Sequence, residues 1–278
     1  MKSILRKPIQ GALSALGVNQ VLFGKNKGLK LRYKNDLNLD MLLGVHEPNT
    51  FEVFDIFVKE GMVVADIGSN VGYFTRFLSK KVGETGAVYA FEPIPQTFKT
   101  LQDTISLNKL TNVTAVNKAV TDCNGTIKMF LSSTHYMASV DVNWATDKGG
   151  AVEVPTVSLD SFFESLGRYP DFIKMDIEGG GVLATKGMRN CIMKHQPILL
   201  MESHTPAEDL AIGQALSLIQ YDVYRVGNDM PVKNLNKDHN DPLGIYETVV
   251  GIPRSKQQLF PNWTPAQFQK RRLGQRRA

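Results

Sequence analysis

The chain has 278 residues, of which 42% are hydrophobic and 21% charged, and its formal net charge is +5. This balance is ordinary for a soluble globular protein, and no apolar stretch reaches the length that a membrane-spanning helix needs. The two cysteines, Cys123 and Cys191, have no paired spacing, so the sequence indicates neither a disulfide framework nor a zinc site and favours a reducing, cytoplasmic compartment.

The first 60 residues are expected to form a helical lead-in to the main domain. The start of the chain is basic and mildly apolar, but Pro8 and Gly11 interrupt it and no longer apolar run follows, so a secretory signal is not expected. Packing of this segment onto the domain is the favoured interpretation, and weak peripheral contact with a membrane is the alternative. Residues 50–57 then predict a helix with Thr50 as its N-cap.

From residue 62 onward, short apolar runs alternate with helical patterns. Such alternation predicts an α/β domain over residues 61–254, with a mostly parallel sheet covered by helices on both faces. Parallel strands are expected at residues 62–67, 88–91, 113–117, 172–176 and 198–202. Helices are expected at residues 71–81, 95–107, 159–166, 182–194 and 206–220, and strands at 222–226 and 247–252 complete the domain.

An interruption separates the third and fourth of these strands. Residues 126–131 and 151–157 predict two further strands, the first after an Asn124-Gly125 pair that is a strong hairpin signal. The long irregular loop between them, residues 132–150, is expected to lie beside the bound ligand. Within this loop, His135 and Tyr136 are candidates for contact with the substrate, and a solvated loop is the alternative.

Residues 255–278 are expected to form a basic, flexible tail. Five of the last nine residues are basic and none is acidic, so much of the net charge belongs to this tail rather than to the domain. A disordered end is the favoured interpretation, and binding of nucleic acid or an anionic membrane is the alternative. Methylation of RNA is disfavoured because the chain has no Asn-Pro-Pro-Tyr motif and the tail has no interleaved aromatic residues for stacking on bases.

The turn at residues 66–72 (DIGSNVG) is the most informative stretch of the chain. It joins a strand-like run to a helix-like run through glycines, which let a backbone approach a ligand closely. Glu92 follows Gly72 by 20 positions, at the end of the next apolar run, where an acid suits the hydroxyls of a ribose. Asp66 before the first glycine disfavours a pyrophosphate, and therefore a nicotinamide-dependent oxidoreductase, and favours a ligand that carries positive charge; a turn acid is the alternative.

Three motifs occur in order: residues 64–75 (VADIGSNVGYFT), 90–93 (AFEP) and 172–179 (FIKMDIEG). Together they resemble the FkbM family of S-adenosylmethionine-dependent methyltransferases, over about residues 51–252. The resemblance implies a Rossmann-like sheet of seven strands with the last strand antiparallel. It also implies transfer of a methyl group to a hydroxyl of a sugar, glycan or small metabolite.

The resemblance also assigns roles to individual residues. It places Asp66, Gly68, Asn70 and Gly72 around the methionine part of S-adenosylmethionine. Glu92 would hold the ribose hydroxyls, with Pro93 and Ile94 at the adenine and Asp176 beside the methyl group. Asp122 would lie near the adenine amino group, or else serve as a turn acid before Asn124-Gly125.

One departure from the family's pattern stands out. The family usually continues Glu-Gly-Ala-Glu, whereas this chain has Glu178-Gly179-Gly180-Gly181, so the second glutamate is missing. This change has three interpretations: altered specificity, weaker activity, or a scaffold that binds the cofactor without turnover.

A hydroxyl acceptor needs a general base or a metal ion to assist the loss of its proton. Asp176 and Glu178 follow one predicted strand and Glu202 and His204 follow the next, so all four should gather at one edge of the sheet. His204 is the best candidate base, because histidine changes charge near neutral pH, and Asp176 and Glu202 are its expected catalytic partners. Glu178 is expected to bind substrate. The same four groups are also a candidate site for a divalent cation.

Overall fold

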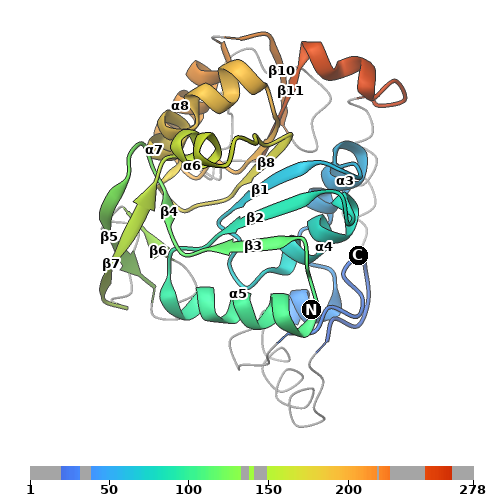
Figure 1. Cartoon of the computed structure of the whole chain (residues 1–278), viewed down its shortest axis with the longest axis vertical. Helices are drawn as coiled ribbons and strands as arrows, with labels where there is room; N and C mark the ends of the chain where they lie inside the picture. Colours follow the sequence, from blue (N-terminus) through green and yellow to red (C-terminus); the bar gives the residue numbers. More distant parts are fainter. Residues whose placement is uncertain are drawn as a thin grey trace, which may run out of the picture.

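The computed structural model describes residues 20–31, 39–132, 138–140, 149–217, 219–225 and 248–264. Its centre is a seven-stranded sheet with the order β10-β11-β9-β8-β1-β2-β3 (Figure 1). Its strands are β1 (Val63–Ile67), β2 (Ala87–Phe91), β3 (Val113–Val116), β8 (Phe172–Met175), β9 (Ile198–Met201), β10 (Tyr221–Arg225) and β11 (Val249–Pro253). Only β11 runs antiparallel to its neighbours in this sheet. The predicted mostly parallel sheet of seven strands with an antiparallel last strand is confirmed.

The strand order reverses direction between β1 and β8, which is where ligands bind in open parallel sheets. The register aligns the carboxyl ends of the four central strands. Ile67 is paired with Phe91 on one side and with Met175 on the other, and Met175 is paired with Met201. The residues that follow these strands therefore lie side by side at one edge.

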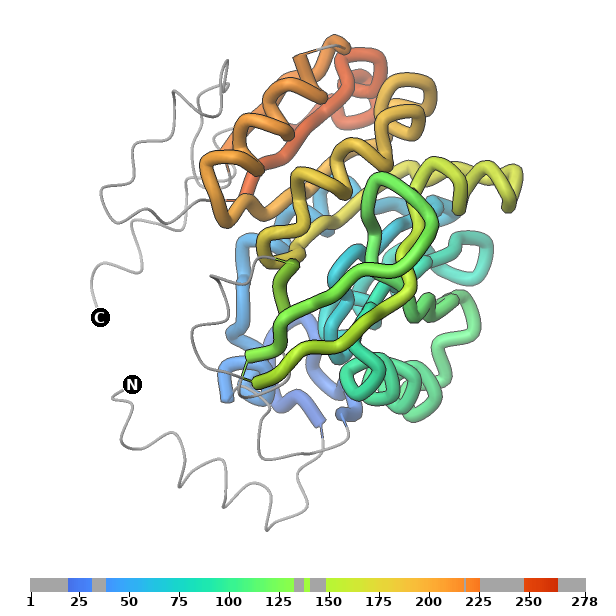
Figure 2. The backbone as a smooth tube through the Cα atoms, turned by 90° about the vertical axis from the view of Figure 1, so that its left-hand side faces the viewer, coloured from blue at the N-terminus to red at the C-terminus, as the bar shows by residue number. Residues whose placement is uncertain are grey.

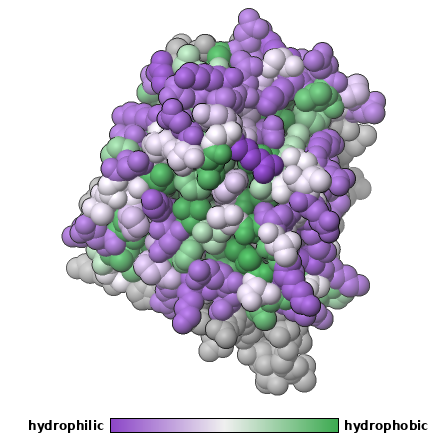
Figure 3. All heavy atoms as spheres, viewed as in Figure 1, coloured by the Kyte–Doolittle hydropathy of each residue, from purple (hydrophilic) through white to green (hydrophobic). Residues whose placement is uncertain are grey.

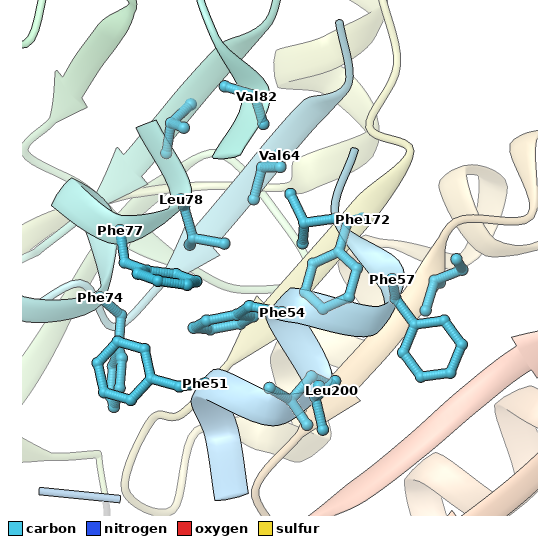
Figure 4. Close-up of a cluster of buried hydrophobic side chains, with 14 of the residues drawn as sticks. Phe51, Phe54, Phe57, Val64, Phe74, Phe77, Leu78, Val82, Phe172 and Leu200 are labelled. Atoms are coloured by element: carbon cyan, nitrogen blue, oxygen red, sulfur yellow. The ribbon is translucent and has the colours of Figure 1, made fainter. Parts of the chain in front are cut away.

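Two apolar layers cover the sheet, because successive strand residues point to opposite faces. Val64 and Phe172 belong to one cluster, with side chains from α3 (Pro48–Phe57) and α4 (Tyr73–Val82). Figure 4 shows this cluster, in which Phe51, Phe54, Phe74 and Phe77 interlock between the two helices and the sheet. Full burial of each such ring contributes about 1.5–3 kcal/mol.

The opposite face carries a second cluster. It packs Ile67 and Ile173 against α6 (Leu159–Leu166), α7 (Gly181–Gly187) and α8 (Pro206–Ser217). α5 (Pro95–Leu107) lies beside β3. In the view of Figure 3, hydrophobic residues gather near the middle of one face and hydrophilic residues surround them.

A second, smaller sheet was not predicted. Its strands are β4 (Ala119–Val120), β5 (Gly125–Leu131), β6 (Ala138–Ser139) and β7 (Ala151–Val157), in the order β4-β7-β5-β6. Figure 2 shows the β5 and β7 pair as a layer distinct from the central sheet. The Asn124-Gly125 pair does not join two paired strands, because β4 pairs with β7 rather than with β5. Instead, the Asn124 side chain accepts a hydrogen bond from the Ser158 N–H (3.1 Å) before α6.

Two helix predictions need correction. α3 begins at Pro48, so Thr50 is not its N-cap but lies in the first turn and donates a hydrogen bond to Glu47 (3.3 Å). The predicted helix at 182–194 is divided into α7 and a π-helix at Cys191–His195. The division follows Gly187, where an added Cβ would lie 1.8 Å from the Thr121 carbonyl oxygen, so the chain must pass close to β4 there.

The chain after β11 continues as a 3-10 helix (Arg254–Leu259) and then packs on the domain. The Phe260 and Trp263 rings contact the Phe57 ring, with centroids 5.0 and 5.3 Å away. Residues 255–264 of the predicted tail are thus part of the domain surface, and the basic end, residues 270–278, lies outside the described residues. No helix among the described residues is long and apolar enough to cross a membrane.

Candidate active site

The carboxyl ends of β1, β2, β8 and β9 open into a cavity of about 700 Å³. The turns that follow these four strands contribute Gly68 to Val71, Glu92 to Ile94, Asp176 to Glu178, and Glu202 with His204. The small sheet adds an apolar wall through Met129, Ala138 and Val140. The sequence before α3 closes another side with Met41, His46 and Glu47.

The turn after β1 fits tightly between two neighbouring strands. Gly68 has a φ of +75°, and an added Cβ would lie 1.9 Å from the Asp176 carbonyl oxygen, so only glycine fits there. The N–H groups of Gly68 and Ser69 both donate to the Phe91 carbonyl (3.1 and 3.0 Å). The turn is therefore fixed to β2 and β8 and presents its backbone to the cavity.

Glu92 presents a buried carboxylate to the same cavity. One oxygen accepts a hydrogen bond from the Asn70 N–H (3.1 Å) and the other from the Ile94 N–H (2.9 Å). Burial raises the pKa of Glu92 to about 7, although these two N–H groups oppose the shift. The Asn117 amide also donates to the carbonyl oxygens of Glu92 and Pro93 (2.8 and 2.9 Å). The carboxylate is thus held in one position with lone pairs left for a ligand.

Lys174 is a buried cation that lines the cavity and was not predicted as a site residue from the sequence. Its ammonium donates to the Gly68 carbonyl (3.1 Å) and to Asp176 (3.3 Å) and lies 3.7 Å from Asp66. Burial alone would lower the pKa of Lys174, but the carboxylates of Asp176 and Asp66 outweigh burial and raise it. A lysine within a strand of otherwise buried apolar residues is the sequence signal that could have identified it.

The four residues predicted to gather after β8 and β9 do so. His204 Nε2 lies 3.4 Å from Glu178 Oε2, 3.6 Å from Glu202 Oε1 and 3.8 Å from Asp176 Oδ1. Burial, together with the neighbouring Asp176, raises the pKa of Glu202 to about 8. Burial would also raise the pKa of Asp176, but Lys174 and then His204 lower it. Of the two carboxyl groups, Glu202 is therefore the one that takes up a proton more readily.

Residues 66–226, more than half of the chain, match the family model of the methyltransferase FkbM domain. This chain belongs to the FkbM methyltransferase family. As a member, it is an S-adenosylmethionine-dependent methyltransferase.

Solved structures resemble the FkbM domain of this chain at low identity. A methyltransferase FkbM from Methylobacillus flagellatus KT is 19% identical with a TM-score of 0.48, and the match covers 68% of this chain and 43% of that one. A SAM-dependent O-methyltransferase from Thermotoga maritima is 13% identical (TM-score 0.42; 76% and 66% covered). Aeropyrum pernix fibrillarin with natively bound S-adenosyl-L-methionine is 12% identical (0.38; 70% and 67%). A search of curated proteins finds no match.

The residues that line the cavity fit S-adenosylmethionine. The cavity offers the Glu92 carboxylate, which can accept hydrogen bonds from hydroxyls, and a turn at Gly68 that no Cβ obstructs. Carboxylates outnumber ammonium groups along the lining, which includes five acids (Glu47, Glu92, Asp176, Glu178, Glu202) and two lysines (Lys118, Lys174). This excess suits a ligand that carries a sulfonium and an amino group.

Three of the predicted cofactor residues do not line the cavity. Asp66 is fully buried beneath the turn, where it accepts a hydrogen bond from the Thr75 hydroxyl (2.7 Å), and burial raises its pKa against the effect of Lys174. Gly72 (φ +85°) lets α4 approach α5, since an added Cβ would lie 2.9 Å from Leu101 Cδ1. Asp122 is exposed in the turn after β4. Asp66 and Gly72 instead stabilise the turn on the side that faces away from the cavity.

The other predicted residues either line the cavity or lie outside the described residues. Gly68, Asn70, Glu92, Pro93 and Asp176 line the cavity, as do Glu178, Glu202 and His204. His135 and Tyr136 lie outside the described residues.

The wall before α3, formed by Met41, His46 and Glu47, was not predicted from the sequence. His46 Nε2 lies 3.0 Å from Glu47 Oε1, and the His46 ring stacks on Phe74 with centroids 6.0 Å apart. Glu47 has a φ of +42°, which non-glycine residues rarely adopt and which is often found at functional sites. Neither residue belongs to a sequence motif, so only the fold brings them to the cavity.

Proposed function

We propose that this methyltransferase transfers a methyl group to a hydroxyl of a sugar, glycan or other small metabolite. The observation that carries the proposal is the cluster of His204 with Asp176, Glu178 and Glu202 on the wall of the cavity that also contains Glu92. A hydroxyl acceptor needs a group that takes its proton, and His204 lies among groups able to orient several hydroxyls. Phosphate-rich acceptors such as RNA are disfavoured, because these carboxylates would repel them.

The residues divide the work between donor and acceptor. When bound, S-adenosylmethionine supplies an electrophilic methyl group and leaves as neutral S-adenosylhomocysteine. Glu92 and the turn at Gly68 hold the donor, and His204 Nε2 takes the proton of the acceptor hydroxyl. Glu178 and Glu202 bind further hydroxyls, and Asp176 stabilises the charge that His204 gains. Alignment of the two reactants is the main contribution to the rate.

A divalent cation is the alternative to a general base at this cluster. Asp176, Glu202 and His204 each offer one ligand atom, and these atoms lie within 4.8 Å of one another. Carboxylates suit Mg²⁺ or Mn²⁺, whereas imidazole suits transition metals such as Zn²⁺ or Fe²⁺, and such an ion would increase the acidity of an acceptor hydroxyl. Assay of turnover after EDTA treatment, with and without added Mg²⁺ or Mn²⁺, distinguishes the two mechanisms.

Two measurements test the proposed function. Calorimetric titration with S-adenosylhomocysteine, and with NAD as the control, tests the cofactor. Incubation with S-[methyl-³H]adenosylmethionine and a panel of sugars, oligosaccharides and hydroxylated metabolites tests transfer, and mass spectrometry locates the methyl group. We expect transfer to an oxygen, and the variant H204N should lose most of it. Cofactor binding without transfer to any acceptor would instead favour a scaffold role.

A further inference from the structure

Glu208 is a buried carboxylate behind the proposed base. It lies in the first turn of α8 and is 1% exposed. Its Oε1 accepts a hydrogen bond from the Gly181 N–H and its Oε2 accepts one from the His204 N–H, both at 2.8 Å. Such charge-assisted hydrogen bonds are short and strong. Glu208 therefore links the start of α7 to the loop that carries His204.

Gly181 is the residue that makes room for this carboxylate. An added Cβ at position 181 would lie 2.8 Å from Glu208 Oε1 and 3.1 Å from its Cδ. Any other residue there would displace Glu208 from the position where it meets both N–H groups. Position 181 is also where the sequence departs from the family's usual glutamate.

The two ring nitrogens of His204 have different surroundings. Nε2 faces the three carboxylates of the cavity. Nδ1 is buried and has no hydrogen-bond partner among the described residues, and Glu208 Oε2 lies 3.9 Å from it. A shift of the imidazole toward Glu208 would bring these two atoms to hydrogen-bond distance, and catalytic hydrogen bonds that are long in a site without substrate often tighten when substrate binds. The bond at one nitrogen then decides which nitrogen carries the proton.

We propose that Glu208 is a positioning residue that keeps a proton on His204 Nδ1, so that Nε2 presents its lone pair to the acceptor, and that Gly181 admits Glu208 to this place. The proposal rests on the proposed function, because it assumes that His204 acts as the base. The acceptor proton moves to Nε2, while Glu208 retains the Nδ1 proton and orients the ring.

The test compares the variants E208Q, G181A and the double variant E208Q/G181A. E208Q keeps the size of the side chain but removes the charge, and we expect kcat to fall roughly 100-fold, a loss within the range of general-base catalysis. The acceptor KM and the affinity for S-adenosylhomocysteine should change less than about twofold. G181A should cause a similar loss by displacing Glu208, and the double variant should be no worse than E208Q, since both changes act through one contact.

The control is G125A, a glycine in β5 with no strained φ and no atom closer than 3.8 Å to an added Cβ. This variant should keep its full activity. If the double variant loses the product of the two single losses, Gly181 does not act through Glu208, and that part of the proposal fails.

A spectroscopic readout separates this proposal from the proposed function. Nitrogen-15 NMR of histidine side chains reports the tautomer of His204, which H204N identifies by loss of its signals. In the wild-type protein we expect the proton on Nδ1, and in E208Q a mixture of tautomers. An unchanged tautomer in E208Q, or a kcat within twofold of wild type, overturns the positioning role. If H204N retains full turnover, the assignment of the base fails, while the tautomer measurement still tests Glu208.

Discussion

The proposed donor end and the proposed acceptor end of the cavity are built in different ways. The donor end comes from two turns within residues 68–94, and backbone N–H groups hold both the Gly68 turn and the Glu92 carboxylate. The acceptor end takes His46, Lys174 and His204 from three segments far apart in the chain, and Glu208 holds the loop that carries His204. It is held mainly by contacts between polar side chains of different segments. Local hydrogen bonds therefore fix the donor end, whereas tertiary contacts between side chains fix the acceptor end.

The largest effect is expected where the two ends meet, at Lys174. K174M leaves the buried Asp66 and the partly exposed Asp176 near each other without their cation, and breaking a buried ion pair such as Lys174 with Asp66 by removal of one partner costs about 3–5 kcal/mol. We expect the free energy of unfolding, measured by urea titration, to fall by that amount. Binding of S-adenosylhomocysteine should weaken as well, because the Gly68 carbonyl loses its contact with β8.

The control for this variant is K128M, at an exposed position on β5. Surface substitutions usually change stability by no more than about 0.5 kcal/mol. A loss for K174M as small as that of K128M would mean that the two ends of the cavity are not joined through Lys174.

The second effect concerns the turn of the donor end. G68A combines a φ of +75° with a Cβ 1.9 Å from the Asp176 carbonyl oxygen. We expect a loss of about 2–4 kcal/mol in stability from strain and overpacking, together with much weaker binding of S-adenosylhomocysteine. G167A is a matched control, because Gly167 has a φ of +60° but no atom within 4 Å of an added Cβ. If both variants lose the same stability, the close approach to Asp176 is unimportant.

The contrast between the two ends also explains what the sequence could predict. The predicted bounds of α5 and α6 agree with the structure, and the bounds of the first five strands of the central sheet (β1, β2, β3, β8 and β9) agree to within a residue. These elements follow from local patterns of apolar residues, glycine and proline. The interruption of the helix at 182–194 depends on the contact between Gly187 and Thr121, and the second sheet depends on the pairing of β5 with β7 across a long connection. No local pattern contains such contacts.

The site shows the same division. Glu92 and the Gly68 turn each follow directly after a strand in a local sequence motif, so their place at the cavity was predictable. The gathering of Asp176, Glu178, Glu202 and His204 was predictable because parallel strands align their carboxyl ends. Glu47 reaches the cavity only because α3 packs on α4, and no residue near it in the sequence indicates this.

A third effect tests Glu92 as the ribose ligand. E92Q should weaken the binding of S-adenosylhomocysteine by roughly 10- to 100-fold, since a hydrogen bond to a charged group contributes about 1.5–3 kcal/mol. In the wild type, the pKa of about 7 means that Glu92 is protonated below neutral pH and accepts hydrogen bonds less well. If only the ionised form binds, affinity should increase roughly tenfold from pH 6 to pH 8.

The pH dependence should disappear in E92Q, because glutamine does not titrate in this range. Calorimetric titrations of both proteins at pH 6, 7 and 8 provide the measurement. An equal pH dependence in the two proteins would assign the titration to another group and would remove the support for Glu92 as the ligand.

The smallest effect is expected at Glu47, which belongs only to the acceptor end. E47N removes the carboxylate, while asparagine tolerates the left-handed conformation better than glutamate does. The relief of backbone strain and the loss of the contacts with Thr50 and His46 should nearly cancel, leaving stability within about 1 kcal/mol of wild type. Affinity for S-adenosylhomocysteine should not change, whereas the acceptor KM should rise because one wall of the acceptor end loses a polar group. If E47N instead weakens the binding of S-adenosylhomocysteine, the wall before α3 belongs to the donor end. In that case, local hydrogen bonds alone do not fix the donor end.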